Sequence, residues 1–480
     1  DLPLSRGLGD VYKRQIRYMS LQLQNTLSGK KEFFKPVDES HVRVYACGPT
    51  VYNFAHIGNA RMAVVNDLLI RVLKTQFKKI TYVSNITDID DKIIDAAKET
   101  GEDISEITIK YTDIYNKDMG ALGVNLPDIQ PKATDHIDGM IELIKKLIDN
   151  DNAYEKNGHV LFHVPSFEKY GILSKRNRDE QIAGSRVEVA PFKKDPADFV
   201  LWKPSPSPLP GWESPWGYGR PGWHLECSVM SEKTLGLPFD IHSGGIDLVF
   251  PHHENEIAQT CCMSKNKDPK DFAPYWLHNG FVNIEGEKMS KSIGNIRLVH
   301  ELNKKYKGEV LRLTLLSAHY KQPLNWNEEI IEQNSKMLDR LYRVVMDLSD
   351  IKFEQGLPSK NIMDSFLDDL NTPKVIANIN EEVNKLSSAS NDEKVKIKSN
   401  LLSTGKILGI LENDPKEWLG YSQQNIENSE EIERLINERN EARRNKNFNL
   451  ADTIRDKLKE KGIEIEDKDK GTVWRKTNEQ

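Results

Sequence analysis

The sequence is poor in cysteine and has neither a long apolar run nor an excess of basic residues. Its 480 residues include four cysteines, two adjacent (Cys261 and Cys262) and two far apart (Cys47 and Cys227). Small secreted domains carry a framework of paired cysteines, so this pattern indicates a reducing, cytoplasmic compartment. No apolar run reaches the roughly 18 residues of a membrane-spanning helix, so we expect no association with a membrane.

The balance of charge excludes a protein that is basic over its whole surface. Lys and Arg number 67 against 73 Asp and Glu, which gives a net charge of −6 at pH 7. Binding to nucleic acid through general attraction to phosphate requires an excess of basic residues, so any such contact must come from a local patch. With 38% apolar residues the chain has enough material for a core, and its length predicts about two to four domains.

Residues 1–18 are expected to lie outside the native protein. The sequence Asp-Val-Tyr-Lys-Arg-Gln at residues 10–15 looks like the translation of a sequencing-library adapter. Nothing before Ile16 has an apolar period or the apolar segment of a secretory signal. We therefore expect the native chain to begin at Met19.

Residues 42–86 predict a βαβ unit and therefore an α/β fold. Apolar residues alternate over residues 42–45, and Gly48 and Pro49 then begin a loop. Apolar residues recur at helical spacing over residues 62–73, and residues 80–83 predict a second strand.

The rest of the chain divides into an insertion and a helical half. Residues near 100–175 are mostly of helical pattern, with short strands around residues 160–162. Six prolines and several tryptophans at residues 202–223 predict an ordered aromatic loop. From about Asn327 onward the pattern is almost entirely helical, over residues 330–348, 362–383 and 395–411.

Four residues of the types that bind zinc are spread over some 210 positions. His252 and Glu256 are four residues apart, so a helix would place them on one face. With Cys47 and Cys227 they make a plausible Zn²⁺ set, because zinc selects thiolate and imidazole ligands. Spacing alone favours another interpretation, in which the cysteines are small core residues and the His-Glu pair is a surface helix contact.

Two further motifs carry groups that suit a bound phosphate. His56-Ile57-Gly58-Asn59 lies where the predicted helix begins, and the unpaired N–H groups of a helix N-terminus attract anions. Lys288-Met289-Ser290-Lys291-Ser292 places two lysines on a loop of small residues, which could clamp a triphosphate. Taken alone, each has an ordinary explanation, a loop histidine with satisfied hydrogen bonds and a solvated basic loop.

From Met19 to Trp474 the chain resembles the cysteinyl-tRNA synthetase family, which belongs to the class I aminoacyl-tRNA synthetases. Six motifs occur in the family's order, at residues 45–52, 56–59, 85–92, 222–227, 250–256 and 288–292. Their joint occurrence is far more specific than any one of them. The resemblance implies a Rossmann-type parallel-sheet catalytic domain (19–330) with a connective insertion (about 115–200) and a stem-contact region (about 290–330), a helical bundle (331–420) and a C-terminal mixed anticodon-binding domain (421–480).

The function implied by the resemblance is ATP-dependent ligation of L-cysteine to tRNA(Cys) through a cysteinyl-adenylate. Zn²⁺ would be held by Cys47, Cys227, His252 and Glu256, with the substrate thiolate as a further ligand. A borderline-soft cation distinguishes cysteine from the nearly isosteric serine better than a shaped pocket does. Thr87 and Trp223 match family positions that line the amino-acid pocket.

The resemblance also implies how ATP is bound. His56, Asn59, Lys288 and Lys291 match catalytic positions, and Gly58 adds to the ATP-binding motif, while Mg²⁺ is expected to arrive with ATP. The class I signature usually ends in a second His, where this chain has Asn59. Because an amide still donates a hydrogen bond, we expect altered detail rather than lost activity. We expect a monomer.

Three aspartates near the third motif, Asp88, Asp90 and Asp91, could suggest a metal site. A structural or turn role is favoured, since Asp is common in turns and helix caps.

The C-terminal region reverses the acidic balance of the chain. Residues 439–461 contain eight basic and four acidic residues, a local balance of +4. Composition alone favours a solvated amphipathic helix. The resemblance implies contact with the GCA anticodon by Arg443, Phe448, Asp452 and Asp467.

Two other functions are compatible with part of this pattern. A cysteine ligase of thiol-cofactor biosynthesis resembles the same catalytic domain but joins cysteine to an amino sugar and lacks an anticodon domain. A catalytically silent RNA-binding paralogue would have no physical reason to keep both the lysine clamp and the thiol site.

Overall fold

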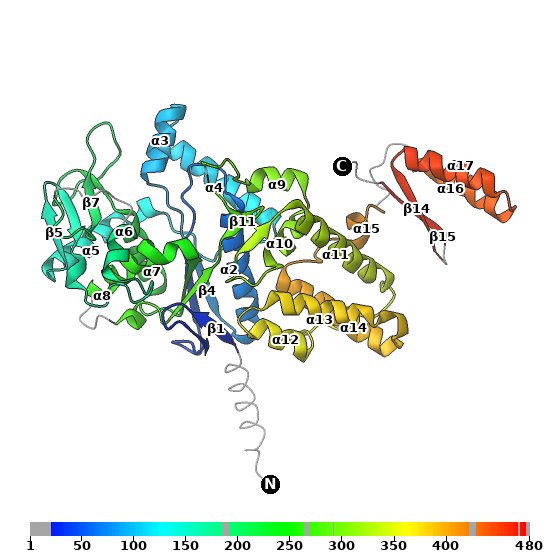
Figure 1. The fold of residues 1–480 in the computed structure, drawn as a ribbon, viewed down its shortest axis with the longest axis horizontal. Helices are drawn as coiled ribbons and strands as arrows, with labels where there is room; N and C mark the ends of the chain where they lie inside the picture. Colours follow the sequence, from blue (N-terminus) through cyan, green and yellow to red (C-terminus); the bar gives the residue numbers. More distant parts are fainter. Residues whose placement is uncertain are drawn as a thin grey trace, which may run out of the picture. The chain divides into compact units, whose positions relative to one another are not determined.

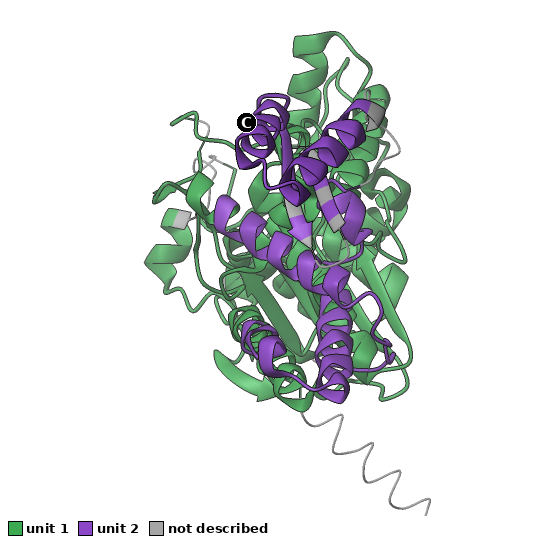
Figure 2. Cartoon of the chain, turned by 90° about the vertical axis from the view of Figure 1, so that its right-hand side faces the viewer, with its two compact units in different colours: residues 1–331, 359–379, 407–409 green, residues 332–358, 380–406, 410–480 purple. Residues whose placement is uncertain are grey.

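A computed structural model describes residues 21–184, 192–263, 268–290, 292–421, 429–468 and 471–476. Residues 1–18 and Lys291 therefore lie outside the described residues. Two compact units are coloured in Figure 2. Unit 1 holds residues 1–331, 359–379 and 407–409, and unit 2 holds residues 332–358, 380–406 and 410–480.

A four-stranded parallel sheet lies at the centre of unit 1. Its strands are β3 (Val42–Ala46), β4 (Ile80–Ser84), β9 (Ile241–Gly245) and β10 (Tyr275–Asn279), in the order β10-β9-β3-β4. Helix α2 (Ile57–Gln76) joins β3 to β4, which confirms the predicted βαβ unit and the α/β class (Figure 1). Every residue of β10 is buried, as expected for a parallel strand covered on both faces.

A largely helical insertion with its own antiparallel sheet separates β4 from β9. The sheet packs beside α5 and α6 in Figure 1, and its last strand closes the loop of prolines and tryptophans. Trp202 is fully buried and its ring centroid lies 6.1 Å from that of Trp216, so this loop is ordered, as predicted. The elements are α3 (Asp91–Thr100), α4 (Ile104–Ala121), α5 (Ile137–Asp149), β5 (Ala153–Lys156), β6 (His159–Phe162), α6 (Arg178–Gly184), β7 (Phe199–Pro204) and β8 (Gly219–Pro221).

Further elements of unit 1 surround the sheet. Helices α7 and α8 carry Cys227 and Glu256 and pack against the same core as α5. A small sheet of order β12-β11-β13 carries Lys288. Bounds are β1 (Gln22–Asn25), β2 (Lys30–Phe33), α7 (Trp223–Leu235), α8 (Glu254–Met263), β11 (Val282–Ile284), β12 (Glu287–Lys288), α9 (Val299–Lys305), α10 (Gly308–Leu316) and β13 (Leu324–Trp326).

The helical half differs from the sequence prediction at one place. The pattern over residues 362–383 predicts one helix, but the structure has α12 (Lys360–Leu367) and α13 (Thr372–Asn384). Asp369 and Leu370 between them have φ of +58° and +52°. The Asp369 carboxylate accepts hydrogen bonds from the Gln24 N–H and the Tyr320 hydroxyl, both at 2.7 Å, and these distant contacts outweigh the helical period.

The remaining helices include a small C-terminal group with its own apolar cluster. That cluster is formed by residues of α16, α17 and the antiparallel β14-β15 hairpin. Bounds are α11 (Glu328–Asp347), α14 (Asn391–Leu408), α15 (Pro415–Trp418), α16 (Ser429–Arg444), α17 (Phe448–Glu460), β14 (Ile463–Lys468) and β15 (Gly471–Lys476). Among the helices that the structure describes, none combines the length and the apolar composition of a membrane-spanning segment.

A buried ion pair joins α2 to α10 in unit 1. The guanidinium of Arg312 is fully buried and lies 2.5 Å from the Asp67 carboxylate, which Arg71 also contacts at 2.7 Å. Burial favours a neutral Asp67, but the charges of Arg312 and Arg71 keep its pKa below the usual value. Arg312 also donates to the carbonyls of Leu122 and Gly123.

Replacing Arg312 by Met is expected to lower the free energy of unfolding by about 3–5 kcal/mol, because it leaves the buried Asp67 carboxylate without its main partner. Urea denaturation of both proteins measures this difference. The double variant Arg312→Met with Asp67→Asn is the control and should recover part of the loss. A loss below about 1 kcal/mol for the single variant would contradict the importance of the pair.

Candidate active site

The structure brings the four predicted zinc ligands together at the carboxyl edge of the central sheet. Cys47 directly follows β3, Cys227 lies in α7, and His252 and Glu256 lie where α8 begins. One ligand atom from each residue lies within 4.8 Å of the others, and all four residues are buried. Because His252 is 1% exposed and Glu256 fully buried, the alternative of a surface helix contact is wrong.

The distances within this set suit a tetrahedral zinc ion. The two sulfur atoms of Cys47 and Cys227 are 3.5 Å apart, as are Cys47 Sγ and His252 Nε2. His252 Nε2 lies 3.0 Å from Glu256 Oε1. Zinc at its usual bond lengths would separate its ligand atoms by roughly 3.3 to 3.8 Å. The two sulfur distances lie within this range and the His252–Glu256 distance lies below it, so the residues present fit the metal once that pair separates slightly.

Burial and neighbouring charged groups shift the pKa values of all four members of the set. Burial opposes charge on Glu256, but His242 and His252 keep its pKa well below the usual value. A hydrogen bond from Cys47 lowers the pKa of Cys227 to about 6, whereas burial raises that of Cys47 well above its usual value. Burial would lower the pKa of His252, but Glu256 raises it to about 10.

Three histidines around the set were not singled out by the sequence analysis. His242 Nε2 lies 2.8 Å from Glu256 Oε2, and His253 Nε2 lies 3.2 Å from Cys47 Sγ. His253 Nδ1 in turn meets His278 Nε2 at 2.8 Å. In the sequence, only His253 could have been linked to the set, because it is next to His252. His242 and His278 lie on separate strands and are not adjacent to the other members in the sequence.

The two predicted amino-acid-binding residues lie beside the metal set. The Trp223 ring stacks on His252 with centroids 4.1 Å apart. The Thr87 hydroxyl donates to Glu226 Oε2 at 3.0 Å, and burial raises the pKa of Glu226 well above its usual value. Trp223 therefore contacts a member of the set directly, and Thr87 contacts Glu226, the residue before Cys227; their role in binding the amino acid stays a prediction.

Asn85 links Thr87 to the residues on either side of Cys47. Its Oδ1 accepts from the Gly48 N–H at 2.9 Å and from the Tyr45 hydroxyl at 3.1 Å, and its Nδ2 lies 3.4 Å from Thr87 Oγ1. A Cβ on Gly48 would lie 1.6 Å from the Asn85 carbonyl oxygen, so only glycine allows this approach.

His56 and Asn59 form a reciprocal cap at the start of α2. His56 Nδ1 accepts from the Asn59 N–H at 3.3 Å, and Asn59 Oδ1 accepts from the His56 N–H at 3.1 Å. A neutral imidazole that accepts at Nδ1 carries its proton on Nε2, so Nε2 is the nitrogen that can donate to a ligand. The Asn59 amide nitrogen is likewise the part of that side chain left to donate.

The motif at residues 288–292, the second one predicted to bind phosphate, reaches the same helix start. Lys288 Nζ lies 4.5 Å from the centre of the Phe281 ring. The Met289 methyl group is 3.4 Å from the place where a Cβ on Gly58 would lie. The Ser290 N–H donates to Asn295 Oδ1 at 2.8 Å. Lys288 is thus the last residue of β12 rather than a loop residue, the next residue Met289 reaches Gly58, and Lys291 is outside the described residues.

The three aspartates have the structural roles that were favoured. Asp90 is the N-cap of α3 and accepts from the Lys92 N–H at 2.9 Å. Asp88 accepts from the Thr134 hydroxyl at 2.6 Å. Asp91 pairs with Lys203 at 2.6 Å and Arg220 at 2.8 Å, which ties α3 to the antiparallel sheet.

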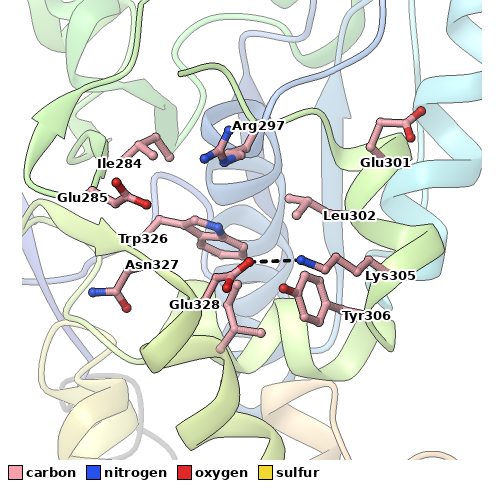
Figure 3. Close-up of a pocket in the computed structure, with 11 residues that line it drawn as sticks. Ile284, Glu285, Arg297, Glu301, Leu302, Lys305, Tyr306, Trp326, Asn327 and Glu328 are labelled. Atoms are coloured by element: carbon pink, nitrogen blue, oxygen red, sulfur yellow. Dashed lines mark hydrogen bonds and ion pairs between the residues drawn. The ribbon is translucent and has the colours of Figure 1, made fainter. Parts of the chain in front are cut away.

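A cavity of about 370 Å³ lies between β11, α9 and the start of α11, and it contains none of the predicted site residues (Figure 3). Lys305 and Glu328 form an ion pair of 3.0 Å in its wall, close to Tyr306. The carbonyl of Arg297, another lining residue, accepts from the Ile57 N–H at 2.9 Å. This wall therefore caps the helix that begins at His56, but the cavity is separate from the metal set.

Two of the predicted anticodon residues are joined in the C-terminal group. Asp467 accepts two hydrogen bonds of 2.8 Å from Arg439 and also contacts Arg443. The hydrogen bond from Arg439 is the main cause that lowers the pKa of Asp467. Phe448 is 61% exposed at the start of α17, which also carries Asp452. In the sequence Arg439 is only one of the basic residues of 439–461. Its partner Asp467 lies 28 residues further along, so the sequence does not indicate the pair.

Comparison with known proteins agrees with this arrangement. The family model described as "tRNA synthetases class I (C) catalytic domain" matches residues 33–336. The model "Cysteinyl-tRNA ligase anticodon binding domain" matches residues 427–475.

Relatives match over nearly the whole chain. The cysteine–tRNA ligase of Parvibaculum lavamentivorans is 54% identical over 96% of this chain and 99% of its own length. That of Rhodospirillum rubrum is 50% identical over 95% and 100%. In fold, a methionyl-tRNA synthetase of Mycobacterium tuberculosis, solved with methionyl-adenylate, matches 80% of this chain and 94% of its own, with a TM-score of 0.56 at 13% identity. The chain therefore belongs to the cysteine–tRNA ligase family of class I aminoacyl-tRNA synthetases.

Proposed function

We propose that the chain attaches L-cysteine to tRNA(Cys) in two steps, first activating cysteine with ATP as an adenylate and then transferring it to the tRNA. The observation that carries the proposal is the buried set of Cys47, Cys227, His252 and Glu256 beside a capped helix start. Cys47 follows β3 and His56 caps α2 at the carboxyl edge of the same sheet, so a thiol site and a phosphate site at this edge would suit a reaction between cysteine and ATP.

The four buried residues would hold Zn²⁺. The ion, when bound, supplies a borderline-soft Lewis acid that takes a thiolate in preference to a neutral hydroxyl group. The chain itself orients the ligands, because His242 holds the second oxygen of Glu256 at 2.8 Å and Trp223 stacks on His252. Selection of cysteine against serine would then need no separate editing site.

His56, Asn59, Lys288 and Lys291 would bind the phosphates of ATP. With its Nδ1 held by the α2 cap, His56 presents Nε2–H as a donor to charge that develops on the phosphate. The substrate carboxylate attacks the α-phosphate in line, pyrophosphate leaves, and no covalent intermediate with the enzyme is required. We assign Mg²⁺ to ATP rather than to a protein site.

The C-terminal group, within the proposed domain of residues 421–480, would read the anticodon. Phe448 is exposed and could stack on an unpaired base, while Arg443, Asp452 and Asp467 supply groups for base edges. Asp467 already orients Arg439 and Arg443, so these three side chains would act as a unit. The presence of this group argues against the amino-sugar ligase, because that enzyme lacks an anticodon domain.

The decisive experiment is cysteine-dependent exchange of pyrophosphate into ATP, followed by charging of a total tRNA pool. We expect exchange with cysteine but not with serine, and charging of tRNA(Cys). Exchange without charging would favour the amino-sugar ligase, and absence of both would favour a silent RNA-binding paralogue. We expect a monomer that works in the cytoplasm.

A further inference from the structure

Arg61 is a fully buried arginine on α2, five residues after His56. Its Nη1 donates to the carbonyls of Gly280 and Phe281 at 3.0 and 2.7 Å. Its Nη2 donates to the carbonyls of His319 and Gln322 at 3.2 and 2.7 Å. One guanidinium therefore binds four main-chain oxygens from two separate segments.

These contacts differ from those of the other fully buried arginine described above. Arg312 pairs with Asp67, whereas Arg61 forms no ion pair with any residue that the structure describes. Burial lowers the pKa of Arg61 to about 10, which leaves it protonated at neutral pH. Burying the Arg61 guanidinium without a carboxylate partner costs free energy. A role of Arg61 in positioning the segments whose carbonyl groups it binds would account for this cost.

The two segments that Arg61 holds are the entrances to the small sheet that carries Lys288. Residues 280–281 lead directly into β11, and residues 319–322 precede β13. Strand β11 pairs with both β12 and β13. Arg61 therefore links α2 to both segments that lead into this sheet.

The same turn contacts Lys288 directly. The Phe281 carbonyl accepts from Arg61, and the Phe281 ring packs against Lys288 Nζ at 4.5 Å. The next residue, Met289, approaches Gly58 of the His56 motif. A shift of this turn would move Lys288 away from the start of α2.

We propose that Arg61 is a positioning residue that holds the end of β12 at Lys288 against the helix beginning at His56, so that both motifs face the same phosphates of ATP. The inference rests on the proposed function, in which His56 and Lys288 bind ATP. Arg61 does not touch the substrate. Its effect comes from preorganisation, where displacement of a charged group by a fraction of an ångström costs rate.

The test is a double-mutant cycle of Arg61→Lys and Lys288→Ala, measured by cysteine-dependent pyrophosphate exchange well below the unfolding temperature. Lys keeps the charge but cannot reach four carbonyls with one planar fork. We expect Arg61→Lys to lower kcat/KM for ATP about 10-fold, with KM for cysteine changed less than about 2-fold. In the Lys288→Ala background the same change should cost less than about 3-fold, because its effect acts through Lys288.

Arg312→Lys is the matched control, since it alters an equally buried arginine that contacts α2 further along. It should lower Tm while leaving the ratio of the two KM values unchanged. Additive effects in the cycle, or equal effects on ATP and cysteine, would overturn the role of Arg61. If Lys288→Ala alone leaves exchange unchanged, the proposed function of Lys288 fails as well.

Should Arg61→Lys not fold, Phe281→Leu tests the second link of the proposal, the contact of the Phe281 ring with Lys288, while the Arg61 hydrogen bond to the residue 281 carbonyl is kept. The proposal then expects a loss of kcat/KM for ATP that disappears in the Lys288→Ala background. A variant with unchanged kinetics for ATP would overturn it.

Discussion

Replacing Cys227 by Ser is expected to remove most of the bound zinc and to lower kcat/KM for cysteine about 10²-fold or more. Loss of one thiolate from a four-ligand set weakens binding of a thiophilic ion, and cysteine then loses the group that recognises its sulfur. KM for ATP should change far less, because His56 and Lys288 lie on other elements. Metal analysis of the purified protein and pyrophosphate exchange at varied cysteine and ATP measure the three quantities.

Cys261→Ser is the matched control for this variant. Cys261 is also a buried cysteine, 2% exposed, and lies on α8 outside the metal set. Its replacement should lower Tm through burial of a hydroxyl group but leave zinc content near one ion per chain. Equal zinc content and equal affinity for cysteine in Cys227→Ser would refute the assignment of the metal site.

Ending the chain after Ser422 should leave pyrophosphate exchange nearly intact and reduce charging of tRNA(Cys) by at least about 10²-fold. That loss corresponds to about 3 kcal/mol, which one or two base contacts and several phosphate contacts can supply. The apolar cluster of Ile432, Leu435, Ile436, Ile454, Leu458, Ile463 and Trp474 consists only of residues beyond the cut. The cut therefore removes this cluster as a whole and does not divide it.

Two point variants on α17 distinguish base stacking by Phe448 from a general effect of losing the C-terminal group. Phe448 and Leu450 are 61% and 47% exposed, so neither contributes much to the core. Phe448→Ala should lower charging about 10-fold if its ring stacks on a base, whereas Leu450→Ala should have no effect. Full charging by the shortened chain would disprove anticodon recognition and revive the amino-sugar ligase.

Periodicity predicted the elements whose contacts are local. Residues 42–86 were recognised as a βαβ unit because the strand and helix periods are visible within a few residues, and the structure confirms them. The same reasoning was wrong for residues 362–383. The break there depends on hydrogen bonds from Asp369 to Gln24 and Tyr320, which lie 345 and 49 residues away.

Local patterns predict the fold class, and six ordered motifs identify the family and the candidate site residues. Only the tertiary structure placed Cys47 and Glu256, 209 positions apart, within 3.5 Å of each other. It also showed the hydrogen bonds of His242 to Glu256 and of Arg61 to the carbonyl of Phe281, whose ring contacts Lys288. A histidine or arginine in an apolar pattern looks the same whatever it contacts. Its role depends on partners that only folding brings near, because hydrogen bonds and ion pairs act over a few ångströms and carry no trace in local periodicity.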